Sequence, residues 1–216
     1  MKRKYKVIIF DLDGTLIDSL HIHFLAFKNL LLEHNIKVSD THLKELIGMP
    51  TVTILKELKN KYKFDYNIQE LREERRYHYF KLLGNRNIVF PGVKSALKRL
   101  HANYKIAVAT GSSKVIFVHS TDKEFQELFD VVVTINDVRK GKPDPSQFIL
   151  TAHKLHFKPI ECVVVGDSIY DAIAAKSAGM DFIGVSAGYS SRKKLLEYGA
   201  IKVIKFVTEL EKALRT

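Results

Sequence analysis

Short apolar runs alternate with helical patterns along most of this chain, and that alternation constrains its fold more than any other feature. The runs are rich in β-branched residues at consecutive positions, as in strands buried on both faces. Apolar residues between them recur at helical spacing, for example Val93, Leu97 and Leu100. We therefore predict an α/β fold, a parallel sheet with helices on both faces. The expected strands are residues 6–11, 105–110, 131–135, 162–167, 181–186 and 201–204.

One long interval breaks the alternation. Residues 18–86 contain no convincing strand, and their apolar residues fall into four successive stretches of helical spacing. This predicts a small helical cap domain, residues 18–86, inserted into an α/β core formed by residues 1–17 and 87–216. Gly14 and the stretch 89–92 are the expected linkers.

Composition excludes several classes of protein. With 46% hydrophobic and 27% charged residues, the 216-residue chain is neither disordered nor fibrous. Cys162 is the only cysteine, which excludes an intrachain disulfide and fits a reducing cytoplasm. The apolar runs are too short to span a membrane, and the run behind the basic N-terminus ends at Asp11, too early for a signal peptide. We expect a cytoplasmic protein without a membrane partner, either a monomer or a dimer.

The net charge of +11 raises the question of an anionic partner. Positive charge is spread along the chain, and its denser runs, residues 2–4, 139–142 and 192–194, are short. No nucleic-acid-binding motif or interleaving of aromatic and basic residues accompanies them, so a nucleic-acid partner is not expected. A positive field that attracts small anions explains the charge better.

Carboxylates follow two of the expected strands. Asp11 and Asp13, two residues apart at the end of the first strand, would lie on one face of an extended chain. Asp167 ends the fourth strand, and Asp171 follows one helical turn later, where it also fits a capping box with Ser168. Carboxyl ends of parallel strands share one edge of a sheet, where ligands bind. Such a cluster favours a hard divalent cation, most simply Mg²⁺.

Two further segments suit a phosphate group. Thr110, Gly111 and Ser112 end the second strand and offer hydroxyl and N–H groups beside a helix start, although an ordinary helix cap fits them too. Lys142 precedes Pro143 in a rigid loop after the third strand. A lysine held among carboxylates is a good clamp for a phosphate.

The motifs together resemble the haloacid dehalogenase superfamily. Its four motifs appear in order as Asp-Leu-Asp-Gly-Thr, Thr-Gly-Ser, Gly-Lys-Pro-Asp-Pro and Gly-Asp-Ser-x-x-Asp. The resemblance covers nearly the whole chain, because the helical insertion lies where the subclass I cap belongs. The branch that holds phosphoglycolate phosphatases and β-phosphoglucomutases looks closest. The resemblance also implies a Rossmann-like sheet with strand order 5-4-1-2-3.

The same resemblance implies roles for the motif residues. Asp11 would be the nucleophile that forms an aspartyl-phosphate, and Asp13 the general acid and base. Mg²⁺ would be held by Asp11, the backbone carbonyl of Asp13, and Asp167. The phosphoryl oxygens would be bound by Thr110, by the N–H groups of Gly111 and Ser112, and by Lys142. Asp171 would orient the metal's waters or Lys142.

The cap is expected to meet the leaving group of the substrate. His23 lies where mutases of the family also carry a histidine, although it is equally well a hinge or polar-face residue. We interpret Arg75, Arg76, His78 and Lys81 as a solvated helix face; the alternative is that one of them reaches a carboxylate of the substrate. Residues 48–53 resemble the family's specificity loop but lack the arginine that mutases use for a second phosphate.

These features predict a Mg²⁺-dependent phosphatase that acts on a small phosphorylated metabolite. A phosphosugar mutase like β-phosphoglucomutase is the alternative. Phosphonoacetaldehyde hydrolases and dehalogenases lack the second acid that Asp13 supplies here. Receiver-type signalling domains are much shorter and carry their phosphate-accepting aspartate on a later strand.

Overall fold

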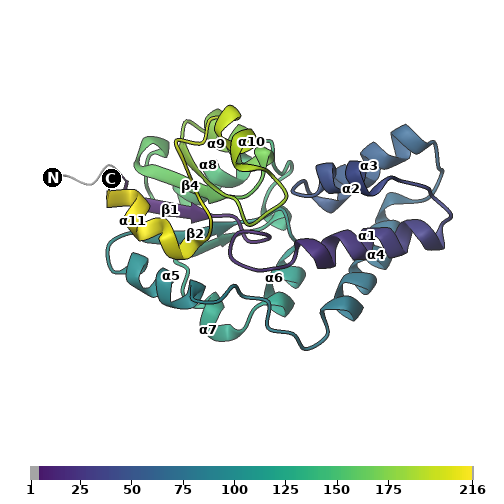
Figure 1. The fold of residues 1–216 in the computed structure, drawn as a ribbon, viewed down its shortest axis with the longest axis horizontal. Coiled ribbons are helices and arrows are strands. Elements are labelled where there is room, and N and C mark those ends of the chain that lie inside the picture. The colour runs from purple at the N-terminus through teal and green to yellow at the C-terminus, as the bar shows by residue number, and fades with distance from the viewer. Residues whose placement is uncertain (1–4, 216) are drawn as a thin grey trace.

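A six-stranded parallel sheet forms the centre of the molecule in the computed structural model, which describes residues 5–215 (Figure 1). Its strand order is β3-β2-β1-β4-β5-β6. The expected parallel sheet is confirmed. Read from the β5 side, the first five strands have the implied order 5-4-1-2-3, and β6 is a sixth strand beyond β5. The strands are β1 Val7–Phe10, β2 Lys105–Ala109, β3 Val131–Val133, β4 Cys162–Gly166, β5 Asp181–Val185 and β6 Lys202–Ile204.

The central strand β1 is buried completely, because helices cover both faces of the sheet. Ile8 and Phe10 point into one apolar cluster with α5, α6 and α11, whereas Val7 and Ile9 point into the opposite cluster with α8, α9 and α10. Consecutive apolar residues are what a strand with two buried faces requires. The helices of this part are α5 Val93–His101, α6 Lys114–Ser120, α7 Lys123–Gln126, α8 Ser146–Lys154, α9 Ile169–Ser177, α10 Arg192–Glu197 and α11 Leu210–Arg215. Short 3₁₀ turns lie at Ile135–Asp137, Pro159–Glu161 and Val207–Glu209.

Of the five helices between β1 and β2, the first four lie to one side of the sheet (Figure 1). We call them the helical segment; they are α1 Leu20–Glu33, α2 Asp40–Leu46, α3 Thr51–Tyr62 and α4 Ile68–Leu83. The helical segment has its own apolar cluster, which includes Phe27, Leu55 and Leu71. Long helices α1 and α4 pack along each other. The sequence pattern thus predicted both the helices and the absence of strands here.

The two connections to the helical segment are joined to each other, and one hydrogen bond links the helical segment to α9. Ile17 and Val89, in the two connections, form a bridge, and the Asp18 N–H donates to the Ile88 carbonyl at 2.7 Å. Farther out, the Tyr170 hydroxyl donates to the Glu45 carbonyl at 2.9 Å. These contacts place the helical segment over the carboxyl ends of the strands.

Among residues 5–215, no helix is both long enough and apolar enough to cross a membrane. The basic run at residues 2–4 and the expectation about a signal peptide lie outside the described residues.

Candidate active site

The motif residues converge where three neighbouring strands end. Asp11 follows β1, Thr110 follows β2 and Asp167 follows β4, and β1 pairs with both of the other strands. All three side chains are buried. The topology therefore brings together residues that are far apart in the sequence, as the shared strand edge predicted.

Lys142 is at the centre of the charged groups. Its ammonium donates to Asp11 Oδ1 at 2.5 Å, to Asp171 Oδ1 at 2.6 Å and to the Ala109 carbonyl at 3.2 Å. Burial lowers the pKa of Lys142, but Asp11 and Asp171 outweigh that effect and raise it above its ordinary value. Lys142 therefore stays cationic although its side chain is only 1% exposed.

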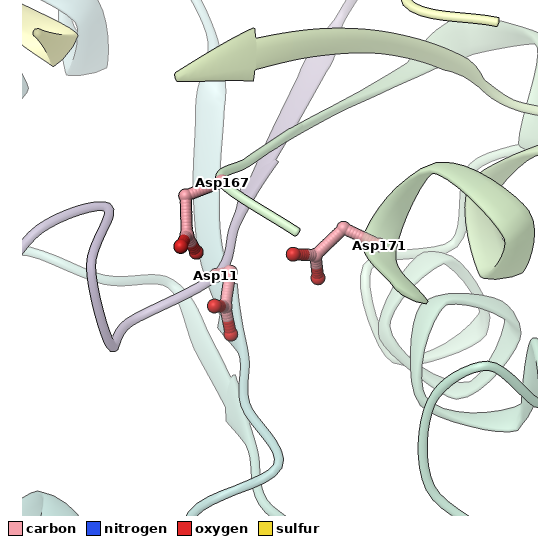
Figure 2. A group of neighbouring side chains, drawn as sticks. All are labelled: Asp11, Asp167 and Asp171. Atoms are coloured by element: carbon pink, nitrogen blue, oxygen red, sulfur yellow. The ribbon is translucent and has the colours of Figure 1, made fainter. Parts of the chain in front are cut away.

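One oxygen atom from each of Asp11, Asp167 and Asp171 lies within 4.8 Å of the other two, and Figure 2 shows the three side chains next to one another at the strand ends. Burial, followed by the neighbouring carboxylates, raises the pKa of Asp11 to about 7 against the opposing effect of Lys142. The pKa of Asp167 is raised well above its ordinary value by burial, Asp11 and Asp171. One lysine does not balance three buried carboxylates, so this cluster has the charge and the donor atoms for a cation.

The three carboxylates differ in how many hydrogen bonds they already accept. Both oxygens of Asp171 are engaged, one by Lys142 and the other by the Ser168 hydroxyl at 2.5 Å. Ser168 and Asp171 also form the predicted capping box at the start of α9. Among the described residues, Asp167 accepts a single long hydrogen bond, 3.4 Å, from the Thr15 hydroxyl. Asp167 is therefore the carboxylate with most capacity left for a metal.

The Asp13 carboxylate faces away from this cluster, toward the helical segment. Oδ1 is 2.6 Å from the Ser19 hydroxyl and 2.7 Å from His23 Nε2, and Oδ2 accepts from the Ser112 hydroxyl at 2.7 Å. Burial would raise the pKa of Asp13, but His23 and these hydrogen bonds outweigh burial and lower it below its ordinary range. Thr110 is a more distant donor, 3.3 Å from Oδ2. The Asp13 side chain is thus held rigidly at the border between the two parts of the chain.

His23 connects Asp13 to a buried arginine. The Arg75 guanidinium donates to His23 Nδ1, so the other ring nitrogen, Nε2, carries the proton that points at Asp13. Burial and then Arg75 lower the pKa of His23 against the effect of Asp13, which keeps the ring neutral. Asp13, His23 and Arg75 therefore form a chain of hydrogen bonds from the strand end into α4.

Arg75 corrects the interpretation of α4 as carrying a solvated basic face. Its side chain is 1% exposed and lies between the rings of Phe27 and Tyr79, 4.8 and 5.3 Å from their centroids. Arg75 Nε has no hydrogen-bond partner within the described chain. His78 is buried as well, with Nε2 2.9 Å from Glu33 Oε2. The prediction failed because Arg75 shares the buried helical stripe of Leu71 and Tyr79.

The loop after β2 lies between the two acids. The Ser112 N–H donates to Thr110 Oγ1 at 3.0 Å, so Thr110 both accepts from this loop and donates to Asp13. The carbonyl of Thr110 accepts from Gln147 Nε2 at 2.5 Å, which fixes the strand end from the side of α8. Within residues 5–215 the Gly111 N–H has no hydrogen-bond partner. Gly111 therefore offers the free backbone donor that the sequence predicted in this loop.

Two glycines make room for Asp167. A Cβ at Gly14 would be 2.7 Å from Asp167 Oδ2, and a Cβ at Gly188 would overlap the same oxygen. Gly14 also has a φ of +75°, which side chains rarely adopt. The sequence pointed to Gly14 through its motif, whereas Gly188 lies 21 residues beyond Asp167 with no local signal.

Comparison with known proteins agrees with this geometry. The family model described as haloacid dehalogenase-like hydrolase matches residues 8–185. The chain belongs to the haloacid dehalogenase-like hydrolases. The resemblance inferred from the four motifs is thereby confirmed, and the chain is an enzyme of a hydrolase family.

Individual relatives include both activities considered from the sequence. A phosphorylated carbohydrates phosphatase of Thermotoga maritima is 30% identical over 93% of this chain and 94% of its own. A β-phosphoglucomutase of Bacillus subtilis is 29% identical over 85% of this chain and 84% of its own. The crystal structure of a hydrolase from Pseudomonas syringae superposes with a TM-score of 0.86 at 30% identity, covering 97% and 98% of the two chains.

Proposed function

We propose that this haloacid dehalogenase-like hydrolase is a Mg²⁺-dependent phosphatase that hydrolyses a small phosphomonoester metabolite through an aspartyl-phosphate. The observation that carries the proposal is the pair of acids at the end of β1. Asp11 contacts Lys142 inside a buried carboxylate cluster, whereas Asp13 faces the helical segment. The two acids therefore have separate surroundings, Asp11 among the carboxylates and Lys142, and Asp13 among hydroxyls and His23 at the border with the helical segment. A bound cation would keep Asp11 ionised as a nucleophile, because it lowers the pKa that burial and the neighbouring carboxylates raise.

The carboxylate cluster fits a magnesium ion. Asp11 and Asp167 would supply side-chain oxygens, the backbone carbonyl of Asp13 a third ligand, and Asp171 would hold Lys142 in place. Asp167 has capacity left for a metal, because it accepts only one long hydrogen bond among the described residues. Two carboxylates, from Asp11 and Asp167, suit Mg²⁺, which binds one or two carboxylates and keeps waters for a phosphate. A bound Mg²⁺ offsets the repulsion between the nucleophile and the phosphate.

In the first step, a carboxylate oxygen of Asp11 forms a bond to phosphorus while the bond from phosphorus to the leaving oxygen breaks. Because its pKa is lowered in the free enzyme, Asp13 must take up a proton as the anionic phosphate binds beside it; it then gives that proton to the leaving oxygen, and the alcohol departs. In the second step, Asp13 takes a proton from a water molecule whose oxygen attacks phosphorus, releasing phosphate and restoring Asp11. Ser19, Ser112 and His23 orient Asp13 for both transfers.

The other motif residues would bind the phosphoryl group. Lys142 brings a fixed positive charge next to Asp11, the Gly111 N–H is free to donate, and the hydroxyl of Thr110 lies beside both. The Ser112 N–H would contribute once its bond to Thr110 is exchanged for one to the phosphate. Donors fixed before the substrate arrives stabilise developing charge without reorganisation.

We further propose the domain division inferred from the sequence, with a cap of residues 18–86 on a core of residues 1–17 and 87–216. The separate apolar cluster of the helical segment supports it. The cap would close the site over a phosphorylated metabolite such as a sugar phosphate. A substrate of this kind and the lone, buried Cys162 fit the cytoplasm.

A β-phosphoglucomutase-like activity is the second candidate. His23 beside Asp13 and the mutase among the relatives favour it. The cap loop of residues 48–53 favours hydrolysis, because it carries no cation next to Asp11 and Asp13 at the place where mutases hold their second phosphate.

The metal requirement is directly testable. Phosphate release from p-nitrophenyl phosphate should disappear with EDTA and return when Mg²⁺ is added in excess. Asp167→Asn should raise the Mg²⁺ concentration needed for half-maximal rate, whereas Asp144→Asn, which alters a carboxylate outside the cluster, should not. Full activity in a demetallated sample would contradict the proposal.

A further inference from the structure

A wide cleft opens beside the catalytic site, between the helical segment and the loop that follows β3. Its volume is about 840 Å³. The cavity at Asp11 and Asp13 is far smaller, about 40 Å³. Thr51, Arg75 and Gly111 line both spaces, so the two lie directly next to each other. A leaving group larger than a few atoms would extend from the small cavity into the cleft.

The cleft is strongly cationic. Arginine and lysine side chains reach it from both walls: Lys56, Arg72 and Arg76 from α3 and α4, and Arg139 and Lys140 from the loop after β3. Among the described residues that line it, the one carboxylate is Asp144. Asp144 already accepts from the N–H and hydroxyl of Ser146. The two walls therefore present a net positive charge to the same space.

The pairing of these cations differs between the walls. Arg76 and Arg72 both lie near Glu73, which neutralises part of the helical side. Within residues 5–215, Lys56, Arg139 and Lys140 form no ion pair within 4.0 Å, although Lys140 lies close enough to Asp144 to lower the pKa of that carboxyl. Like charges facing one another across a gap repel, and an anion between them removes that repulsion.

We propose that this cleft binds a second phosphate group of the substrate, so that the enzyme prefers bisphosphorylated metabolites to their monophosphates. The inference rests on the proposed phosphatase function and specifies its substrate class. One phosphate would sit at Asp11, and the leaving group would pass Gly111 and Thr51 to place the other between Lys56 and the pair Arg139 and Lys140. Charge-assisted hydrogen bonds to phosphate are about twice as strong as neutral ones.

Fructose 1,6-bisphosphate and its two monophosphates, fructose 1-phosphate and fructose 6-phosphate, test the preference. Phosphate release is measured with Mg²⁺ at an ionic strength of about 0.15 M, where charges beyond about 8 Å are screened. We expect kcat/KM for the bisphosphate to exceed that of the better monophosphate by roughly tenfold, the gain from one charged contact of ordinary strength. Equal values in the wild-type enzyme would overturn the inference.

Charge-matched variants locate the effect. Arg139→Gln/Lys140→Gln and Lys56→Gln should each bring the ratio of bisphosphate to monophosphate kcat/KM toward one. Lys193→Gln/Lys194→Gln also removes two positive charges, but from α10, away from the cleft, and should keep the wild-type ratio. If the cleft variants keep the ratio, or the α10 variant loses it to the same degree, the preference does not come from the cleft.

A binding measurement separates this inference from the proposed function. In Asp11→Asn with Mg²⁺, calorimetric titration should give a Kd for the bisphosphate roughly tenfold below those of the monophosphates. That preference without turnover by the wild-type enzyme would support the cleft and contradict the phosphatase proposal. If the wild-type enzyme hydrolyses p-nitrophenyl phosphate but shows no preference for the bisphosphate in rate or binding, the phosphatase proposal is supported and the inference about the cleft is contradicted.

Discussion

At the scale of single residues, the division of labour between the two acids of β1 is the central expectation. Asp11→Asn keeps the shape of the side chain but replaces the nucleophilic carboxylate by an amide. We expect turnover of p-nitrophenyl phosphate to fall by more than about a hundredfold, because no covalent intermediate can form. A thermal melt should still show a folded protein, since Lys142 keeps its contact with Asp171. Turnover above about one percent would place the nucleophile elsewhere.

Arg75 gives a second expectation, because it acts on Asp13 through His23. Arg75→Met fills a similar volume without a charge and should leave the melting temperature nearly unchanged or raised, as when buried charges are replaced by apolar groups. His23 would lose the donor that fixes its tautomer. Hydrolysis of fructose 1-phosphate, whose alcohol needs a proton to leave, should then slow by about tenfold or more.

p-Nitrophenyl phosphate, whose leaving group needs no proton, should be affected much less by Arg75→Met. Lys81→Met, an exposed position on the same helix, is the matched control and should change neither rate. Equal slowing of both substrates by Arg75→Met would mean that Arg75 supports the structure and does not position the acid.

These residues also show what a sequence can reveal about a site. Asp11, Asp13 and Asp167 were predicted because acids at the ends of buried strands must share one sheet edge. Arg75 was placed on the wrong face because its charge was weighed above its helical spacing from Leu71. Gly188 was missed because its requirement is space for Asp167, and only folding brings the two together.

At the scale of elements, Asp130 ties the start of β3 to β2. Its Oδ2 accepts from the Ile106 N–H at 2.9 Å and its Oδ1 from Lys105 Nζ at 2.7 Å. Burial acts to raise the pKa of Asp130, but these bonds and His101 outweigh it and lower the pKa. A carboxyl with a lowered pKa in the folded state contributes stability above its unfolded pKa, and that contribution is lost as the pH falls through the folded value.

Asp130→Asn should therefore lower the free energy of unfolding at pH 7 by about 1 kcal/mol, or the melting temperature by about 2–4 °C. The difference from the wild type should shrink below about pH 4, where the unfolded aspartate is protonated. Glu127→Gln, with an exposed carboxylate, is the control and should melt like the wild type at both pH values. A difference for Asp130→Asn that stays constant with pH would contradict the charge argument.

The six strands were predictable because each contains consecutive apolar residues, as buried strands of a parallel sheet do, and all six expected runs contain a strand. Which face of each helix is buried was less predictable. The α4 helix carries charge all round, and its buried side is set by α1 and the sheet edge, which the local sequence does not describe.

At the scale of the whole molecule, the insertion after β1 was visible because seventy helical residues interrupt the strand-helix alternation. The cationic cleft was not visible in the sequence, although the sequence does show the basic run at residues 139–142. Its partners on α3 and α4 are about seventy residues away, and only the placement of the helical segment over the strand ends brings them to face it.

The same cleft bears on whether the enzyme hydrolyses or isomerises phosphosugars. A mutase must hold a bisphosphorylated intermediate in two orientations and protect the aspartyl-phosphate from water. Residues 48–53 carry no cation close to Asp11, and the cations of the cleft, Lys56, Arg139 and Lys140, are exposed to solvent. Water therefore has access to the site from the cleft, so hydrolysis should outpace phosphate return to the sugar.

Incubation of β-glucose 1-phosphate with Mg²⁺ and a trace of glucose 1,6-bisphosphate distinguishes the two reactions. We expect free phosphate to form at least about tenfold faster than glucose 6-phosphate. The bisphosphate, held by the cleft, should itself be consumed as a substrate, whereas a mutase regenerates it in every cycle. If glucose 6-phosphate accumulates ahead of free phosphate while the bisphosphate persists, the cleft serves a mutase intermediate and the hydrolase assignment is wrong.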